Sequence, residues 1–225
     1  MDLSLEVQPR ELRCLIGPNG AGKSTFFKIL SGGLKPSAGS VRFRNQEITH
    51  LDAFRIARLG ISIKFQVPSL FEQLSVFKNL HIAAENHFGF ADGLKRTKRM
   101  LDRIGFMECA DVPAASLSHG QKQRLEIAMA TIAEPRLILL DEPTAGMSTD
   151  EVDRTIEFVE DMTKFSTIIV VEHNMDFVRR ISRWVTVMHE GQVFAEGPMS
   201  EIEANAGVRD IYLGRRRTRS NVEGE

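Results

Sequence analysis

The sequence predicts an α/β fold in which a parallel sheet core carries a small antiparallel β part and an inserted helical subdomain. Short apolar runs of strand length alternate with stretches of helical spacing, as in a parallel sheet that is covered on both faces. These runs occur early in the chain, at 12–17, and again at 136–141, 166–172 and 183–189. Between about residues 70 and 132 only helical spacing is found, which indicates an insertion into one core.

The first half of the core is predicted to hold three strands and one helix. LRCLIG (12–17) is an apolar run that ends in glycine, which is typical of a buried strand. GKSTFFKILSG (22–32) has the spacing of a helix that paired glycines stop. GSVRFRN (39–45) alternates between turn residues and predicts an edge strand, and LGISIKFQ (59–66) predicts a strand that ends at Gln66.

The inserted block and the second half of the core complete a single domain over 1–225. Helical spacing in the block runs through VFKNLHIAAENHF, GLKRTKRMLDRIGFM and GQKQRLEIAMATIAE. The later apolar strands, RLILLD, STIIVVE and RWVTVMH, are again separated by helical stretches. We therefore predict an α/β core made of 1–69 and 133–214, a helical subdomain over 70–132 and a flexible polar tail over 215–225.

The composition limits the class of protein. The chain of 225 residues has 29 Lys plus Arg and 30 Asp plus Glu, and its net charge of −1 argues against nucleic acid as a partner. No apolar run approaches the roughly 20 residues of a membrane-spanning helix, and the N-terminus lacks the pattern of a signal peptide. Cys14 and Cys109 lie far apart without metal-ligand spacing, which indicates reduced thiols. We therefore expect a cytoplasmic protein.

Residues 17–25, GPNGAGKST, fit the P-loop pattern G-x-x-x-x-G-K-S between a predicted strand and a predicted helix. Glycines in such a loop let backbone N–H groups converge on phosphate oxygens, and the helix N-terminus adds positive potential. A chance match in a glycine-rich turn is the alternative, which the flanking strand and helix disfavour. The predicted phosphate-binding residues are Gly17, Pro18, Asn19, Gly20, Ala21, Gly22, Lys23, Ser24 and Thr25.

Three side chains of this loop have distinct expected roles. Lys23 reaches the β and γ phosphates as a point charge, and Ser24 offers its hydroxyl to Mg²⁺. Thr25 lies one position further into the helix and bonds an α-phosphate oxygen. The loop therefore predicts a nucleotide site that also holds a divalent cation.

The run LILLDE (137–142) supplies the second half of this site. Its apolar residues place Asp141 at the end of a buried strand, where open α/β sheets bind ligands and where an aspartate can hold Mg²⁺. A second carboxylate beside it, Glu142, is costly unless it has a chemical role, and activation of the attacking water is that role. The alternative is that Glu142 caps a helix that begins at Pro143.

Between these two motifs lies LSHGQKQRLEIAMA (117–130), a segment that P-loop GTPases and nucleotide kinases lack. It resembles the signature sequence of the ATP-binding cassette (ABC) family, usually LSGGQ, with His119 in place of the first glycine of the pair. Gln66 resembles the Q-loop glutamine, DEPTAGMS (141–148) resembles the Walker B and D-loop segment, and His173 in VVEHNM resembles the switch histidine. The resemblance spans residues 12–175.

The resemblance implies a RecA-like P-loop NTPase fold and hydrolysis of ATP, with ATP and Mg²⁺ as cofactors. The catalytic residues that it implies are Glu142, His173 and Gln66. The residues that it places at the metal are Ser24, Gln66 and Asp141.

The resemblance also implies a second ABC ATPase subunit as a partner, in a head-to-tail homo- or heterodimer. Each ATP would lie between the P-loop of one subunit and the signature helix of the other. The signature residues implied to contact that nucleotide are Ser118, Gly120 and Gln121. A helix N-terminus near Ser118 suits this role because it attracts anions.

Longer segments resemble the ATPase subunits of branched-chain amino-acid-type importers, among them LGISIKFQVPSLFEQLSVFKNL, VVEHNMDFV and VRDIYLGR. Within that group, FEQLSVFKNL, the histidine of LSHGQ and VTVMHEGQVFAEG are most similar to the urea-transporter ATPase. This resemblance implies transmembrane permease subunits as partners and a periplasmic solute-binding protein as an indirect partner. It implies a location on the cytoplasmic side of the inner membrane.

Two other functions stay open at this point. One is a soluble ABC ATPase of DNA repair or translation, although the chain has neither the long coiled coil nor the second cassette of such proteins. The other is a degenerate or truncated cassette that binds nucleotide as a regulatory module. In the family, a segment before LSLEVQP supplies a strand and an aromatic residue that stacks on adenine, and no aromatic residue precedes Gly17 here. We therefore expect weakened ATP binding by this chain and a longer native protein.

Overall fold

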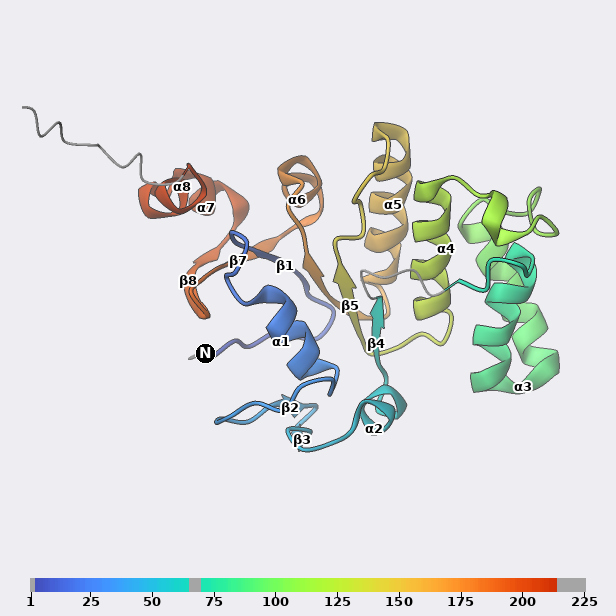
Figure 1. The fold of residues 1–225 in the computed structure, drawn as a ribbon, viewed down its shortest axis with the longest axis horizontal. Coiled ribbons are helices and arrows are strands. Elements are labelled where there is room, and N and C mark those ends of the chain that lie inside the picture. Colours follow the sequence, from blue (N-terminus) through green and yellow to red (C-terminus); the bar gives the residue numbers. More distant parts are fainter. Residues whose placement is uncertain (1–2, 65–69, 214–225) are drawn as a thin grey trace, which may run out of the picture.

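The computed structural model describes residues 3–64 and 70–213 (Figure 1). Its strands are β1 (Leu12–Ile16), β2 (Arg42–Phe43), β3 (Gln46–Glu47), β4 (Ile61–Lys64), β5 (Leu137–Asp141), β6 (Thr167–Val171), β7 (Trp184–His189) and β8 (Gln192–Gly197). Its helices are α1 (Lys23–Leu30), α2 (Ala53–Arg58), α3 (Val76–Arg103), the 3-10 helix η1 (Ala114–Ser116), α4 (His119–Thr131), α5 (Thr149–Met162), α6 (Met175–Ile181), α7 (Met199–Ala204) and α8 (Ala206–Leu213).

A six-stranded sheet in the order β4-β5-β6-β1-β7-β8 forms the centre of the molecule. Its first five strands are parallel, and β8 runs antiparallel to β7. Leu12 of β1 pairs with Ile168 of β6, and Arg13 pairs with Trp184 of β7. Because parallel strands end on the same side, the carboxyl ends of β1, β5 and β6 meet at one edge of the sheet, where α/β proteins bind ligands.

The predicted fold class is confirmed, with two refinements to its strands. The antiparallel part is a separate hairpin of β2 and β3, in which Arg42 pairs with Glu47. The sequence predicted a single edge strand there, but Arg44 and Asn45 have φ values of 51° and 64°, which turn the chain back on itself. The sequence analysis also missed β8, an edge strand that makes the sheet mixed rather than wholly parallel.

Both faces of the sheet are buried, which explains the near-continuous apolar strands. One core cluster combines alternate strand residues such as Cys14, Leu140 and Val170 with side chains of α4, α5 and α6. The other core cluster combines the strand residues Leu15, Leu139 and Val171 with helix residues. These are Phe26 and Phe27 of α1 and Ile56 of α2. The sheet is therefore the middle of three layers.

From residue 70 to the start of β5 the secondary structure is helical, as the sequence predicted. α3 covers 76–103 and is interrupted at Gly89, which has a φ of 71° and a ψ of 175°. η1 and α4 follow, and α4 packs against α3. The domain boundaries 1–69, 70–132 and 133–214 stay a prediction, and the predicted tail, 215–225, lies outside the described residues.

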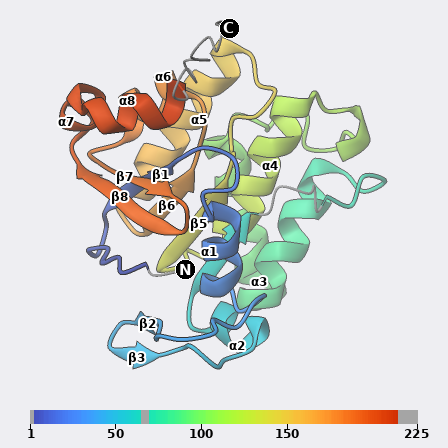
Figure 2. The same cartoon turned by 60° about the vertical axis from the view of Figure 1, so that its left-hand side comes forward.

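The two views agree on how the outer elements are distributed. Figures 1 and 2 show the β2–β3 hairpin and α2 together at one end of the molecule, with α7 and α8 far from them beside β7 and β8. Within 3–64 and 70–213, no helix is long and apolar enough to cross a membrane.

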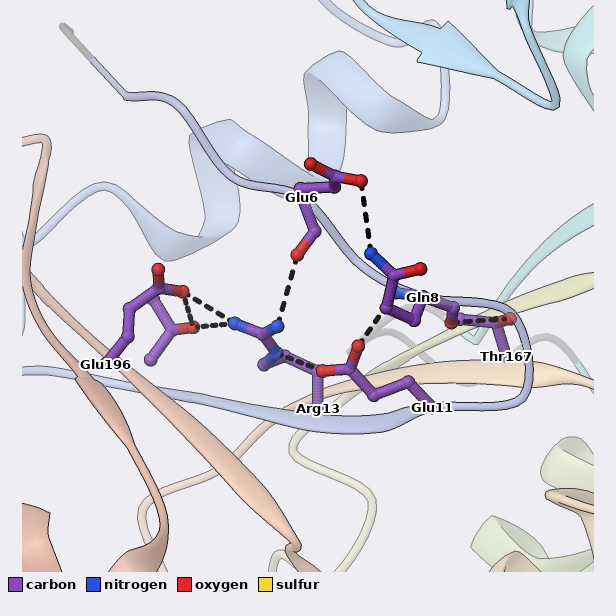
Figure 3. A network of polar contacts seen from close by, with 7 residues as sticks. Glu6, Gln8, Glu11, Arg13, Thr167 and Glu196 are labelled. Carbon is purple, nitrogen blue, oxygen red and sulfur yellow. Dashed lines mark hydrogen bonds and ion pairs between the residues drawn. The ribbon is translucent and has the colours of Figure 1, made fainter.

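Arg13 of β1 fastens the segment before the sheet to the sheet itself (Figure 3). Its guanidinium donates to Glu11, to Thr186 of β7 and to Glu196 of β8, and to the backbone oxygen of Glu6. The Arg13 side chain is 7% exposed, so both carboxylates neutralise a buried charge. Residues 3–7 form no strand, but three of their side chains, Leu3, Leu5 and Val7, pack against the core cluster under α1 and α2.

Candidate functional site

The predicted phosphate-binding loop connects β1 to α1. All five residues of β1 are buried, and the chain leaves the sheet at Gly17. A Cβ atom there would lie 2.3 Å from the carbonyl oxygen of Met188 on β7, so only glycine fits. Gly22, with a φ of 103°, turns the chain into the first helical residue, Lys23. The loop therefore folds against the positive end of α1, as phosphate binding requires.

Lys23 is held inside the loop by the loop's own backbone. Its Nζ donates to the carbonyl oxygens of Gly17 at 2.7 Å and Pro18 at 3.1 Å, and the residue is 6% exposed. Burial lowers the pKa of Lys23, while the charges of Glu142 and Asp141 act in the opposite direction. Charged phosphate oxygens are stronger acceptors than these neutral carbonyls, so a nucleotide would compete for the ammonium group.

A pocket of about 320 Å³ lies in front of the loop. Its lining residues are Asn19, Gly20, Ala21, Gly22, Lys23, Ser24, Thr25, Glu142, Val171 and His173. The structure thus brings the loop together with Glu142 and His173, two of the three predicted catalytic residues. The third, Gln66, lies outside the described residues.

The end of β5 places two carboxylates beside this pocket. β5 ends at Asp141, and the chain turns at Glu142, whose φ is 46°. The Glu142 N–H donates to the carbonyl oxygen of Val171 at 2.9 Å, which ties the turn to β6. Burial raises the pKa of Asp141, the charge of Glu142 raises it further, and nearby cations act in the opposite direction. Two adjacent carboxylates at the mouth of a phosphate pocket form a place where a cation is favoured.

The alternative role for Glu142, as the cap of a helix that begins at Pro143, is wrong. The next helix, α5, begins at Thr149, and the Ser148 side chain caps it by accepting from the N–H of Glu151. Glu142 instead points to the pocket, where its Oε1 lies 3.1 Å from Nε2 of His173. The two predicted catalytic side chains therefore contact each other.

The buried carboxylate of Glu172 joins the two loops that carry these side chains, and sequence analysis did not identify it. Its Oε1 accepts from the N–H and the hydroxyl of Thr144, at 2.9 and 2.5 Å. Its Oε2 accepts from the N–H groups of His173 at 2.8 Å and Asn174 at 3.1 Å. A charged residue directly after the apolar strand TIIVV was the available signal. Glu172 thus fixes the loop after β6 relative to the loop after β5.

Two more residues at the site were missed. Lys64, at the end of β4, pairs with Leu140 and is buried, and the charges of Glu126 and Asp141 oppose the fall in its pKa that burial causes. Tyr212 of α8 is 39% exposed; desolvation raises its pKa to about 12, and the nearby backbone of Gly17 in the P-loop acts in the opposite direction. No local pattern marks either residue, because both reach the site through the arrangement of the sheet and α8.

The signature segment lies apart from the pocket of its own chain. Ser118 is the N-cap of α4, as predicted, and forms a capping box with Gln121. His119, the departure from the usual signature, has its Nε2 3.1 Å from the carbonyl oxygen of Ala145 in the D-loop segment. Ser118, Gly120 and Gln121 do not line the pocket in front of the P-loop. The N-terminus of α4 is therefore separate from the pocket in front of the P-loop.

The side chains at the pocket fit a magnesium–nucleotide complex. The hydroxyl of Ser24 and the carboxylate of Asp141 are hard oxygen ligands, which Mg²⁺ takes together with phosphate and water. Burial, and after it the charge of Glu142, raises the pKa of Asp141, and a cation bound at this carboxylate would favour its ionised form. Magnesium bound there would neutralise phosphate charge during hydrolysis.

Comparison with known proteins agrees with this site. Residues 1–145 match the ABC transporter family. The chain is 35% identical to the high-affinity branched-chain amino acid transport ATP-binding protein LivG of Escherichia coli K12, over 95% of this chain and 91% of LivG. It is 33% identical to the corresponding protein BraF of Pseudomonas aeruginosa, over 94% and 90%.

A solved structure has a similar fold. The nucleotide-free ATP-binding cassette of an ABC transporter superposes with a TM-score of 0.83 at 27% identity, over 94% of this chain and 91% of that one. The family match covers the P-loop, the signature helix and the end of β5, whereas Val171 and His173 of the pocket lie beyond it. The chain belongs to the ABC transporter family and is one of its ATPase subunits.

Proposed function

We propose that this chain powers an importer as one of two cassettes that pair head to tail around ATP. The carrying observation is that the signature residues Ser118, Gly120 and Gln121 do not line the pocket in front of the P-loop. The P-loop pocket carries Glu142 and His173, whereas Ser118 caps α4 elsewhere in the molecule. A second subunit in the opposite orientation would bring its α4 to the open side of the pocket. This complementarity favours a paired ATPase over a regulatory module.

The contacts at the pocket support a separate role in ATP hydrolysis for each of three side chains. Glu142 accepts the proton of the attacking water as general base. His173, 3.1 Å from it, orients that carboxylate and lies where it can contact the terminal phosphate. Lys23 leaves the carbonyl oxygens of Gly17 and Pro18 and neutralises the β and γ phosphates. Phosphoryl transfer needs such positioning and charge compensation more than covalent help from the protein.

A groove on the molecule supports a permease as the partner to which ATP-driven pairing is coupled. It has a volume of about 1030 Å³ and lies between α2, β4, α3 and the end of α4. Phe54 and Ile82, which line it, are 65% and 42% exposed, so apolar area is available for a partner. Docking there would hold the chain at the cytoplasmic side of the inner membrane.

The proposed solute is urea, or a branched-chain amino acid or amide-like molecule, delivered by a periplasmic binding protein. The names of LivG and BraF support branched-chain amino acids, and the segments FEQLSVFKNL and VTVMHEGQVFAEG support urea. ATPase activity of the chain assembled with its permease and binding protein distinguishes the two. We expect urea to stimulate turnover and leucine to leave it unchanged; the reverse result would assign the amino acid.

The pairing is tested by placing a cation and bulk at the N-terminus of α4. In a Glu142→Gln background, which retains ATP, Ser118→Arg should abolish the dimer peak in sizing chromatography with ATP. Binding of a fluorescent ATP analogue to the monomer should persist, because Ser118 does not line the pocket. The control is Ser200→Arg, at an exposed position on α7. An undiminished ATP dimer in the Ser118→Arg protein would contradict the head-to-tail arrangement.

A further inference from the structure

The carboxylate of Glu151 lies at the N-terminus of α4. Its Oε1 accepts a hydrogen bond of 2.9 Å from the hydroxyl of Ser118, the N-cap of that helix. A Cβ atom on Gly120 would lie 2.3 Å from the Glu151 Cδ and within 2.5 Å of both carboxylate oxygens. The carboxylate therefore fills the space that the missing side chain of Gly120 leaves open, beside the first turn of the signature helix.

Glu151 is anchored there from its own helix, α5. Its Oε2 accepts from the N–H of Ser148 at 3.0 Å and from the Ser148 hydroxyl at 3.1 Å. These bonds, with the bond from Ser118, lower the pKa of the Glu151 carboxyl, so the group is ionised at neutral pH. The N-caps of α4 and α5 thus share one negative charge, which stabilises both helix ends.

A phosphate bound at the N-terminus of α4 would compete with this carboxylate for the same position. The carboxylate accepts from the Ser118 hydroxyl and fills the space beside Gly120, and a phosphate there would need both. Two negative charges a few ångströms apart repel each other, by about 1 kcal/mol in water and by more away from water. The phosphate can enter only when the carboxylate has moved.

We propose that Glu151 occupies, in the free subunit, the anion site on α4 that the terminal phosphate of a partner's ATP must enter. Pairing of two subunits then requires Glu151 to release Ser118 in each of them. This inference rests on the proposed head-to-tail function and adds a competing ligand to it. Glu151 is a competing anion within the same chain. Because it must be displaced, it raises the ATP concentration needed for pairing.

The test removes the charge and keeps the shape. Glu151→Gln retains a side-chain acceptor for the capping box, because glutamine suits the same helix position. In the Glu142→Gln background, the dimer fraction is measured by sizing chromatography with light scattering across an ATP series. We expect Glu151→Gln to lower the half-saturating ATP concentration at least about fivefold, because one like charge is lost at each of two sites.

The matched control is Asp150→Asn, which removes the neighbouring exposed charge from the same turn of α5 and leaves Ser118 alone. It should shift the ATP midpoint less than about twofold. Melting curves without nucleotide establish that each variant is folded. If Glu151→Gln does not fold, Glu151→Ala replaces it, with the same expected direction.

The possible outcomes separate the two proposals. A parent protein that forms no ATP-dependent dimer contradicts the paired function and, with it, this inference. A parent that dimerises normally, with a Glu151→Gln midpoint that is unchanged, higher, or equal to that of Asp150→Asn, overturns the role of Glu151 alone. A selective fall in the midpoint supports it.

Discussion

Glu142 owes its position to two features of single residues: a left-handed backbone and a contact with His173. The φ of 46° turns its side chain from the end of β5 toward the pocket, and His173 meets it at 3.1 Å. We predict that Glu142→Gln lowers ATP turnover about 10²- to 10⁴-fold, the usual contribution of a general base. Binding of a fluorescent ATP analogue should be retained, because Lys23 and the loop are untouched.

A suitable control for this variant is Glu134→Gln. Glu134 is also left-handed, with a φ of 51°, but it is exposed beyond the end of α4 and pairs with Arg96. Its replacement should leave the turnover of the chain without its permease within about twofold, as for other surface sites. Turnover by Glu142→Gln above about half of the wild-type rate would refute the assignment of the general base.

A second prediction at the residue scale concerns Glu172. The Glu172→Gln variant keeps one acceptor oxygen but loses charge from four hydrogen bonds that hold Thr144, His173 and Asn174. We predict a loss of about 1–3 kcal/mol in the free energy of unfolding, the cost of disturbing buried charged hydrogen bonds. kcat should fall while KM for ATP changes little, since Glu172 positions His173 and does not line the pocket. An equal change in kcat and in KM would contradict this positioning role.

At the scale of elements, Arg13 connects β1, β7 and β8 with the segment that precedes the sheet. We predict that Arg13→Ala lowers the free energy of unfolding by about 3–5 kcal/mol, because Glu11 and Glu196 lose a buried partner. Urea denaturation measures this loss. Arg42→Ala, on the exposed strand β2, should stay within about 0.5 kcal/mol of the wild type. An equal loss of unfolding free energy in both variants would show that the Arg13 network stabilises the fold no more than an exposed arginine does.

At the scale of the whole molecule, nucleotide binding should stabilise the fold. With ATP and Mg²⁺ at 100 times the dissociation constant, the free energy of unfolding should rise by about 2.7 kcal/mol. Lys23→Ala should remove most of this increment without destabilising the free protein, because the lysine is buried against two neutral carbonyls. EDTA should reduce the increment in the wild type. An undiminished increment in Lys23→Ala would exclude the lysine from phosphate binding.

The sequence by itself determined the features that depend on neighbouring residues. The P-loop, the strand that ends at Asp141 and the helix that Ser118 caps are each built from a short stretch of chain, so composition and spacing were enough to place them. The alternation of apolar strands and helices likewise predicted the layered sheet, since strands buried on both faces need apolar residues at every position.

Only the tertiary structure decided which of these stretches meet. The strand order puts β5 beside β6, and thereby brings His173 to Glu142 and Glu172 to Thr144. Glu151 meets Ser118 because α4 and α5 pack side by side with their first turns together. These contacts join residues far apart in the chain and involve polar side chains, which carry no periodic signal. Their positions follow from sheet order and helix packing, which the whole set of buried contacts selects together.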